Sequence, residues 1–223
     1  MFEGKSETYK KNVIEGVLSV YDSREVRALV GDAYLDYTFE NLPENPREDF
    51  QKALTAAKRF SDNWESVIEK GQGLYLYSPK SGTGKTTLMA CLRHDLVHKG
   101  CGCAMVNASE LMRQAQGRGS SWEGSRVYSY SMFLNVDVLI LDDIGIHNLK
   151  VENGHTQWIQ DEMYYLLDHR CRKRKSTLFT SNYSLPQLRD ERGYDFKTVD
   201  RIIELSSLVL RLDGESFRGQ RSR

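Results

Sequence analysis

The chain has 223 residues, of which 39% are hydrophobic, 10% aromatic and 28% charged, and its 31 basic residues balance its 31 acidic residues. These values fit one large domain, or one domain with a short arm, and any contact with nucleic acid must come from a local patch of charge. The lack of an apolar run of about 20 residues and of a signal-peptide pattern excludes a membrane-spanning or secreted protein, and four cysteines without zinc-ligand spacing indicate reduced thiols in the cytoplasm rather than a disulfide scaffold or a metal cluster.

The first forty residues differ from the rest of the chain. Apolar side chains recur on one face of residues 9–21, which predicts an amphipathic helix, and residues 34–43 are expected to form an extended connector. We therefore predict an N-terminal helical arm with its connector, residues 1–38, and a main domain, residues 39–223. The apolar face of the arm either packs on the main domain or binds a partner helix, and the sequence leaves both open.

The main domain alternates between strand and helix patterns. Short apolar runs, typical of buried strands, are followed by segments with helical spacing. The predicted strands are residues 73–77, 101–107, 136–141, 176–181 and 208–212, and the predicted helices are residues 47–70, 86–99, a segment that Ser109 caps and Glu110 begins, 156–169, 185–189 and 198–205. This alternation predicts an α/β fold in which helices cover both faces of a central parallel sheet.

The turn between the first strand and the next helix reads Ser-Pro-Lys-Ser-Gly-Thr-Gly-Lys-Thr-Thr. Gly82 and Gly84 allow the backbone to wrap closely and to point successive N–H groups at a phosphate, beside the positive end of a helix. Lys85 is expected to reach the β- and γ-phosphates, and the Thr86 hydroxyl to bind Mg²⁺. The motif departs from the usual P-loop pattern only at Ser78, which replaces the first glycine. The predicted nucleotide-binding residues are Pro79, Lys80, Ser81, Gly82, Thr83, Gly84, Lys85, Thr86 and Thr87.

Two predicted strands end in polar side chains. Asp142 and Asp143 follow the third strand, and Asn182 follows the fourth. Parallel sheets bind ligands at the carboxyl ends of their strands, and burying acids there is costly unless a cation or a water needs them. Asp142 is therefore the expected Mg²⁺ ligand beside Thr86, and Asp143 is expected to polarise an attacking water. Asn182 can bind the γ-phosphate or that water.

Four segments together resemble the AAA+ ATPase core of the DnaC/DnaI-type helicase loaders. They are Ser-Gly-Thr-Gly-Lys-Thr-Thr, Val-Asp-Val-Leu-Ile-Leu-Asp-Asp-Ile-Gly, Thr-Leu-Phe-Thr-Ser-Asn-Tyr and Gly-Glu-Ser-Phe-Arg, and related IstB transposition ATPases share much of this pattern. The resemblance covers about residues 34–218. It implies a three-layer P-loop NTPase fold with ATP and Mg²⁺ as cofactors. It also implies a protein that self-associates through its ATP sites and loads or holds a replicative hexameric (DnaB-type) helicase on single-stranded DNA.

The resemblance further implies roles for individual residues. Those matching the catalytic motifs are Lys85 with Thr86 (Walker A), Asp142 and Asp143 (Walker B), Asn182 (sensor 1), Arg201 (arginine finger) and Arg218 (sensor 2). Arg201 would stabilise charge on the γ-phosphate in a neighbouring subunit, and Arg218 would sense the nucleotide in its own subunit, although either can instead be a solvated surface charge. Asp143 stands where related enzymes usually have Glu, and because a shorter carboxylate positions water less well, we expect slow hydrolysis.

Residues 111–133 interleave arginines with aromatic residues in a sequence rich in Gly and Ser. Arginines that contact phosphates and rings that stack on bases suit a sequence-tolerant single-strand site. The predicted nucleic-acid contacts are Arg113, Arg118, Trp122, Arg126 and Tyr128. The aromatic residues can instead pack against the domain. The basic run at residues 169–175 is expected to be mainly a solvated helix end, with contact to DNA as the alternative.

Three functions are compatible with these sequence features. The first is the ATP-hydrolysing helicase loader, with docking expected through residues 9–21 because only about forty residues precede the core. The second is an IstB-type transposition ATPase that acts on duplex DNA. The third is an adaptor that binds nucleotide and a protein partner with little hydrolysis. A small-molecule kinase fits least, because the acidic pair and Asn182 have no evident role in one.

Overall fold

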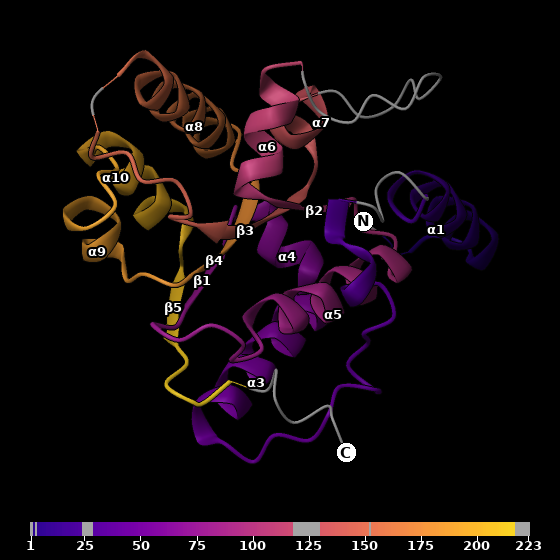
Figure 1. Ribbon diagram of the computed structural model, residues 1–223. Helices are drawn as coiled ribbons and strands as arrows, with labels where there is room; N and C mark the ends of the chain where they lie inside the picture. Colours follow the sequence, from indigo (N-terminus) through magenta and orange to yellow (C-terminus); the bar gives the residue numbers. More distant parts are fainter. Residues whose placement is uncertain (1, 3, 24–28, 118–129, 152, 217–223) are drawn as a thin grey trace.

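The structure, a computed structural model, describes residues 2, 4–23, 29–117, 130–151 and 153–216 (Figure 1). Within these residues a five-stranded sheet has the order β2-β3-β4-β1-β5, and each pair of neighbouring strands is parallel. The strands are β1 (Leu74–Tyr77), β2 (Cys103–Asn107), β3 (Val138–Ile144), β4 (Ser176–Ser181) and β5 (Leu208–Arg211). The predicted α/β fold with a central parallel sheet is confirmed.

Helices cover both faces of this sheet (Figure 1). One face carries α1 (Glu7–Tyr21), α3 (Glu48–Asp62), α4 (Trp64–Glu69) and α5 (Lys85–His98), and the other carries α6 (Ala108–Ala115), α7 (Tyr130–Asn135), α8 (Gly154–Arg172), α9 (Leu185–Asp190) and α10 (Phe196–Leu205). A short 3-10 helix, η1 (Asp32–Tyr34), follows α1. Side chains of β1 alternate between the two cores, since Leu74 and Leu76 face α3 and α5 whereas Tyr75 lies in the core under α6 and α8. None of the described helices is long and apolar enough to cross a lipid bilayer.

The helix of the N-terminal arm, α1, lies against α5. Val17 and Leu18 pack on the core formed by α3, α4 and α5, and Arg93 of α5 donates a hydrogen bond to the carbonyl of Tyr21 at the end of α1. Tyr9, near the other end of α1, is 44% exposed. Of the two alternatives for the apolar face of the arm, packing on the main domain is therefore the one observed, and the first turns of α1 stay accessible.

The observed boundaries differ from the prediction at several elements: residues 34–43 contain a turn at residues 38–41 rather than one extended connector, and three further differences have a clear local cause. The helix predicted over residues 47–70 is two helices, because the backbone of Asn63 leaves helical geometry with φ −113° and ψ 24° between α3 and α4. The helix after β2 begins earlier than predicted, at Ala108, because the Asn107 side chain accepts the N-cap hydrogen bond from the N–H of Ser109. The six residues of α7 were not predicted, since so short a segment does not display a helical period.

Candidate nucleotide site

The loop between β1 and α5 uses glycine where its backbone is left-handed. Gly82 and Gly84 have φ of 77° and 97°, which a residue with a side chain adopts only at a cost. Gly84 also approaches α3, since a Cβ at this position would lie 2.8 Å from the Phe50 ring. Ser78 does not have a positive φ, and its hydroxyl accepts a hydrogen bond from the N–H of Lys80 at 3.2 Å. A serine therefore fits the first position of the motif in this protein.

Lys85 connects this loop to the end of β4. Its side chain is buried, with the whole residue 7% exposed. The ammonium donates hydrogen bonds to Asn182 Oδ1 at 2.9 Å and to the carbonyl of Lys80 at 3.4 Å. Lys85 is also the first residue of α5, so the N–H groups of the first helical turn and the positive end of this helix lie at the loop. The loop thus combines backbone donors, a helix N-terminus and a held ammonium, which suits a phosphate group.

Thr86 and Asp142 lie in direct contact, as expected for residues that share a metal. Thr86 Oγ1 donates to Asp142 Oδ1 at 3.0 Å, and Thr180 Oγ1 of β4 donates to the same oxygen at 2.5 Å. Burial raises the pKa of the Asp142 carboxyl, whereas the hydrogen bonds from Thr180 and Thr86 lower it. A divalent cation at this carboxylate would compensate the buried charge, and a hydroxyl and a carboxylate oxygen are ligands that Mg²⁺ accepts.

Asp143 points to a different part of the site than Asp142. β3 continues beyond its predicted end to Ile144, and its pairing with β4 shifts register between Leu141 and Ile144. Within this irregularity Asp143 has φ 59°, and its side chain accepts a hydrogen bond from Asn182 Nδ2 at 3.5 Å. The bulge separates two adjacent carboxylates, so that one contacts Thr86 and the other contacts the polar end of β4.

Two buried polar atoms, one in the loop and one in the segment that leads into α3, have no hydrogen-bond partner in the described part of the chain. One is Thr83 Oγ1 in the loop itself, and the other is Asn45 Nδ2 in the segment that leads into α3. Asn45 is 5% exposed, and its side-chain oxygen accepts from the N–H of Arg47 at 3.2 Å. Buried polar atoms are rarely left unpaired, and a polar ligand in the loop would supply a partner for the Thr83 hydroxyl. The residues present therefore fit a nucleotide with its metal.

The segment after β5 lies across the loop. Lys80 and Glu215 form an ion pair at 3.1 Å, and Arg47 donates to the carbonyl of Glu215 at 3.4 Å. The N–H of Asp213 donates to the carboxylate of Asp49 at 2.7 Å. These contacts join the last described residues to both the loop and the start of α3.

The two predicted arginines have different outcomes. Arg218 lies outside the described residues. Arg201 lies on α10, where it pairs with Asp168 of α8 at 3.1 Å and with Glu204 at 2.5 Å, and the hydrogen bond with Glu204 raises its pKa. Within one chain, the arginine side chain thus joins α10 to α8. Its predicted action on a neighbouring subunit stays a prediction.

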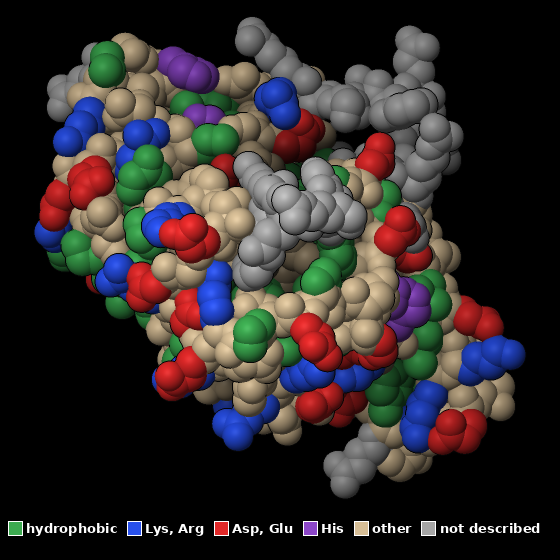
Figure 2. Space-filling view, turned by 60° about the horizontal axis from the view of Figure 1, so that its bottom comes forward, with side chains coloured by type: hydrophobic (Ala, Val, Ile, Leu, Met, Phe, Trp, Pro, Cys, Tyr) green, Lys and Arg blue, Asp and Glu red, His purple; other side chains and the backbone are tan. Residues whose placement is uncertain are grey.

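Most of the predicted nucleic-acid contacts, namely Arg118, Trp122, Arg126 and Tyr128, lie outside the described residues. Arg113 is described, and its guanidinium pairs with Glu110 on the same helix at 2.7 Å. Figure 2 shows lysines and arginines interspersed with acidic side chains over the face that it draws, without one large basic patch. Nucleic-acid contact by Arg113 stays a prediction.

The basic run at the end of α8 is not simply a solvated helix end, as the sequence suggested. Arg170 is fully buried and donates hydrogen bonds to the carbonyls of Phe133, Val136 and Ser176 at 2.8, 3.0 and 2.6 Å. Lys175 pairs with Asp137, so this residue too has a structural partner. The prediction was wrong for Arg170 because two of the carbonyls that satisfy it, those of Phe133 and Val136, come from a segment distant in sequence.

Two residues at the site, Thr180 and Phe50, were not predicted from the sequence to have a role there. Thr180 is a buried polar residue near the end of β4, two positions before Asn182, but Ser176, Thr177 and Ser181 of the same strand are buried and polar as well, so the sequence does not single it out. Phe50 carries no polar signal, because its approach to Gly84 depends on how α3 packs.

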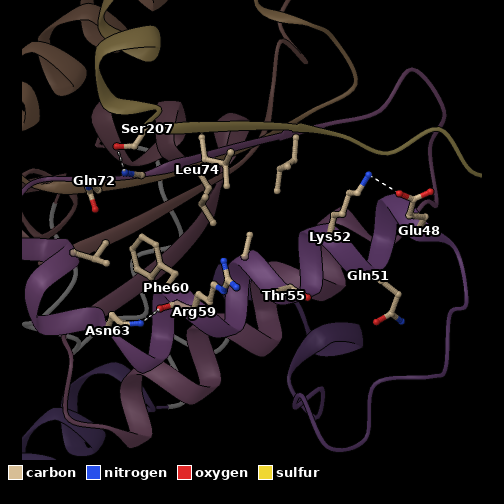
Figure 3. Close-up of a pocket in the computed structure, with 15 residues that line it drawn as sticks. Glu48, Gln51, Lys52, Thr55, Arg59, Phe60, Asn63, Gln72, Leu74 and Ser207 are labelled. Atoms are coloured by element: carbon tan, nitrogen blue, oxygen red, sulfur yellow. Dashed lines mark hydrogen bonds and ion pairs between the residues drawn. The ribbon is translucent and has the colours of Figure 1, made fainter.

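A groove of about 620 Å³ lies between α3 and the edge strand β5 (Figure 3). Thr55 and Arg59 of α3 line one wall, and Leu208 and Leu210 of β5 line the other. None of the predicted nucleotide-binding residues lines this groove, so it is separate from the P-loop site.

Comparison with known sequences places the chain among nucleotide-binding proteins. A family model described as IstB-like ATP binding protein matches residues 11–223. The replicative helicase loader DnaI of Bacillus subtilis is 31% identical over 160 residues, which cover 67% of this chain and 48% of DnaI. The replicative helicase loader DnaC of Escherichia coli K12 is 21% identical over 78% of this chain and 66% of its own length. The chain therefore spans about half the length of DnaI.

Solved structures agree with this placement. The alignment with a crystal structure of DnaI covers 87% of this chain and 100% of the DnaI chain in that structure, with a TM-score of 0.65 and 23% sequence identity. The alignment with a crystal structure of the DnaC helicase loader covers 81% of this chain and 99% of the DnaC chain in that structure, with a TM-score of 0.64 and 25% sequence identity. These likenesses confirm the P-loop AAA+ fold. Because the family model matches nearly the whole chain, the protein belongs to the IstB-like ATP-binding family, and its resemblance to the DnaC/DnaI-type AAA+ proteins is confirmed.

Proposed function

We propose that this protein binds ATP with Mg²⁺ at the P-loop. Lys85 and the N-terminus of α5 would bind the phosphates, and Thr86 and Asp142 would hold the metal. The metal, when bound, neutralises charge on the β- and γ-phosphates. The observation that carries this proposal is the pair of contacts Lys85–Asn182 and Thr86–Asp142, which join the loop to the ends of β4 and β3.

We further propose that the protein hydrolyses ATP slowly. Asp143 would polarise the attacking water, and Asn182, within 3.5 Å of that carboxylate, would orient the water or the γ-phosphate. The Asp143 side chain is one methylene shorter than Glu, which places the base further from the water. Self-association would bring Arg201 of one subunit to the ATP site of the next, with Arg218 acting in its own subunit.

A loss of ATP turnover in Lys85→Ala and in Asp143→Asn would support hydrolysis at this site, with Lys52→Ala as a surface control. Lys52 pairs with Glu48, one turn before it on α3, and both side chains are exposed. A wild-type protein that binds ATP without measurable turnover would instead favour the nucleotide-binding adaptor.

The biological role proposed is that of a cytoplasmic loader, which loads or holds a replicative hexameric helicase on single-stranded DNA. The relatives DnaI and DnaC are named replicative helicase loaders, and this supports the proposal. Arg113, Arg118, Trp122, Arg126 and Tyr128 would contact the DNA. The accessible first turns of α1, near Tyr9, would contribute to helicase binding.

A pull-down with the hexameric replicative helicase, with and without ATP, tests this role. ATP-sensitive association that is weakened by deletion of residues 1–33, and by Tyr9→Ser, would support it. Tyr9→Ser is the milder variant, since Val17 and Leu18 of α1 remain packed on the core. No ATP-sensitive association with the helicase would contradict the loader role.

A transposition ATPase that acts on duplex DNA is the second candidate, because the matching family is described as IstB-like. Size-exclusion chromatography with ATP and either duplex or single-stranded DNA separates the two. Large assemblies on duplex DNA alone would favour the transposition ATPase, whereas complexes with single-stranded DNA would favour the loader.

A further inference from the structure

Arg192, in the turn between α9 and α10, binds the backbone that follows β3. Its Nε donates to the carbonyl of Gly145 at 2.7 Å, and its Nη2 donates to the carbonyl of Ile146 at 2.9 Å. The two donors belong to one rigid planar group, so they fix the two successive carbonyls relative to each other. Lysine, with a single flexible ammonium, does not reproduce this geometry.

The backbone around Arg192 packs closely on the same turn. The carbonyl of Arg192 accepts from the N–H of Leu149 at 2.8 Å, and Tyr194 OH accepts from the N–H of Gly145 at 3.1 Å. A Cβ at Gly193 would lie 2.6 Å from the backbone nitrogen of Lys150. The turn after β3 and the turn before α10 therefore form one tightly packed unit, and a displacement of the first must be followed by the second.

This unit adjoins the predicted water-polarising and sensing residues. The turn after β3 lies two residues beyond Asp143, and the Arg192 guanidinium lies 5.0 Å from the centroid of the Tyr183 ring. Tyr183 directly follows Asn182, whose side chain contacts both Lys85 and Asp143. One guanidinium thus binds the backbone immediately after β3 and lies against the ring of the second residue after β4, at the edge where a γ-phosphate would be sensed.

The same unit leads directly into α10. Asp195, three residues after Arg192, caps α10 by accepting from the N–H of Thr198 at 2.7 Å. Along its outer face α10 presents two exposed apolar side chains, Phe196 at 70% and Ile203 at 51%. The position of the α10 cap therefore determines how this apolar face is presented.

We propose that Arg192 is a positioning residue that couples the γ-phosphate end of the nucleotide site to α10, so that ATP changes the order of α10 and of its exposed face. This inference rests on the proposed ATP binding. The coupling is reciprocal: a partner that binds the exposed face of α10 would also change ATP affinity.

Hydrogen exchange of the full chain tests the coupling, with and without AMPPCP and Mg²⁺. In the wild type we expect the nucleotide to slow exchange in residues 196–205 by about threefold or more. Arg192→Gln removes the guanidinium, and Arg192→Lys keeps the charge but not the paired donors. Both are expected to bind AMPPCP within about threefold of wild-type affinity while losing most of the protection in α10. If the wild type hydrolyses ATP, both Arg192 variants are expected to have a lower kcat with little change in KM.

Arg189→Gln is the matched control, since Arg189 lies one turn earlier and its guanidinium pairs with the adjacent Asp190 at 2.8 Å. It should retain the protection. Thermal melts establish that each variant folds, and if Arg192→Gln does not fold, Arg192→Lys decides the question. Protection of α10 that persists in folded Arg192→Lys, or that the wild type lacks although it binds AMPPCP, would overturn the coupling alone. Failure of the wild type to bind AMPPCP would overturn the proposed function as well.

Discussion

The Thr180 hydroxyl on β4 donates to Asp142 Oδ1 at 2.5 Å and accepts from the backbone N–H of Asp143 at 2.9 Å. One side chain of β4 therefore positions both acidic residues of the neighbouring strand β3, Asp142 through its carboxylate and Asp143 through its backbone N–H. Its place in the middle of the site explains why a residue that would not itself touch ATP can determine the geometry of those that would.

Thr180→Val is predicted to disturb both acidic residues while conserving side-chain volume. The substitution leaves a buried carboxylate and a buried N–H with one partner fewer, which costs about 1–3 kcal/mol of unfolding free energy. It should also weaken binding of ATP with Mg²⁺, because the carboxylate of Asp142 is no longer oriented. Urea denaturation and nucleotide titration measure the two effects. Thr180→Ser keeps the hydroxyl and should stay close to the wild type on both, and equal losses in the two variants would show that the hydroxyl is not responsible.

Asp142→Asn is predicted to stabilise the protein in the absence of nucleotide at neutral pH. Burial raises the pKa of this carboxyl above its ordinary value of 3.8, so the folded state binds the proton more tightly than the unfolded chain. The stabilisation from this proton is complete below about pH 3.8 and is lost as the pH rises through the raised pKa of the folded state. Asparagine is uncharged at every pH in this range, so the variant does not lose this stability as the pH rises. Its side-chain oxygen can still accept hydrogen bonds from Thr86 and Thr180.

Thermal melts between pH 4 and 8 check this prediction, with the expected gain in Tm growing toward the higher pH values, about one to a few °C. ATP with Mg²⁺ should then raise the Tm of the wild type and not that of Asp142→Asn. Asp62→Asn, which changes an exposed carboxylate, is the control and should show neither effect. A variant less stable than the wild type at pH 8 would contradict the assignment of a burial cost to Asp142.

Arg170→Met is predicted to destabilise the fold by about 3 kcal/mol or more, because it removes the guanidinium donors from several buried carbonyls. The carbonyls of Phe133, Val136 and Ser176 all accept hydrogen bonds from this guanidinium. Arg172→Met, two residues later, removes an exposed guanidinium that pairs with Asp168 and should cost less than about 1 kcal/mol. Denaturant melts of the two variants give the comparison, and similar values for both would disprove a special role for the buried residue.

Glu215→Gln is predicted to leave stability within about 0.5 kcal/mol of the wild type, because the pair with Lys80 is largely exposed. Its effect should instead appear in nucleotide binding, since Lys80 is released toward the phosphates. We expect ATP affinity to rise about twofold at low salt, with the gain disappearing at high ionic strength. Glu48→Gln, which breaks the exposed pair with Lys52 on α3, should change neither quantity. Weaker ATP binding by Glu215→Gln would mean that Glu215 helps to hold the nucleotide.

Local sequence was sufficient to predict the P-loop and its position between a strand and a helix. The apolar run before Asp142 and the similar run before Asn182 predicted two parallel strands, and such strands end at one edge of a sheet, so their polar ends were expected to meet. The structure places Asn182 within hydrogen-bonding distance of Lys85. Helix starts were less predictable, because Asn107 and Ser109 are both good caps and only the observed hydrogen bond distinguishes them.

The amino-acid sequence alone therefore determined the set of strands, the phosphate loop and the identity of the side chains at the strand ends. These features depend on neighbours within a few positions. Only the tertiary structure decided that Arg170 is buried, that Thr180 holds both acids and that Arg192 spans the ends of two strands. The physical reason is the same for all three. A buried polar side chain stabilises the fold only if nearby groups form hydrogen bonds with it. In these three cases such groups come from segments about 40 residues away, which approach only when the sheet and its helices pack.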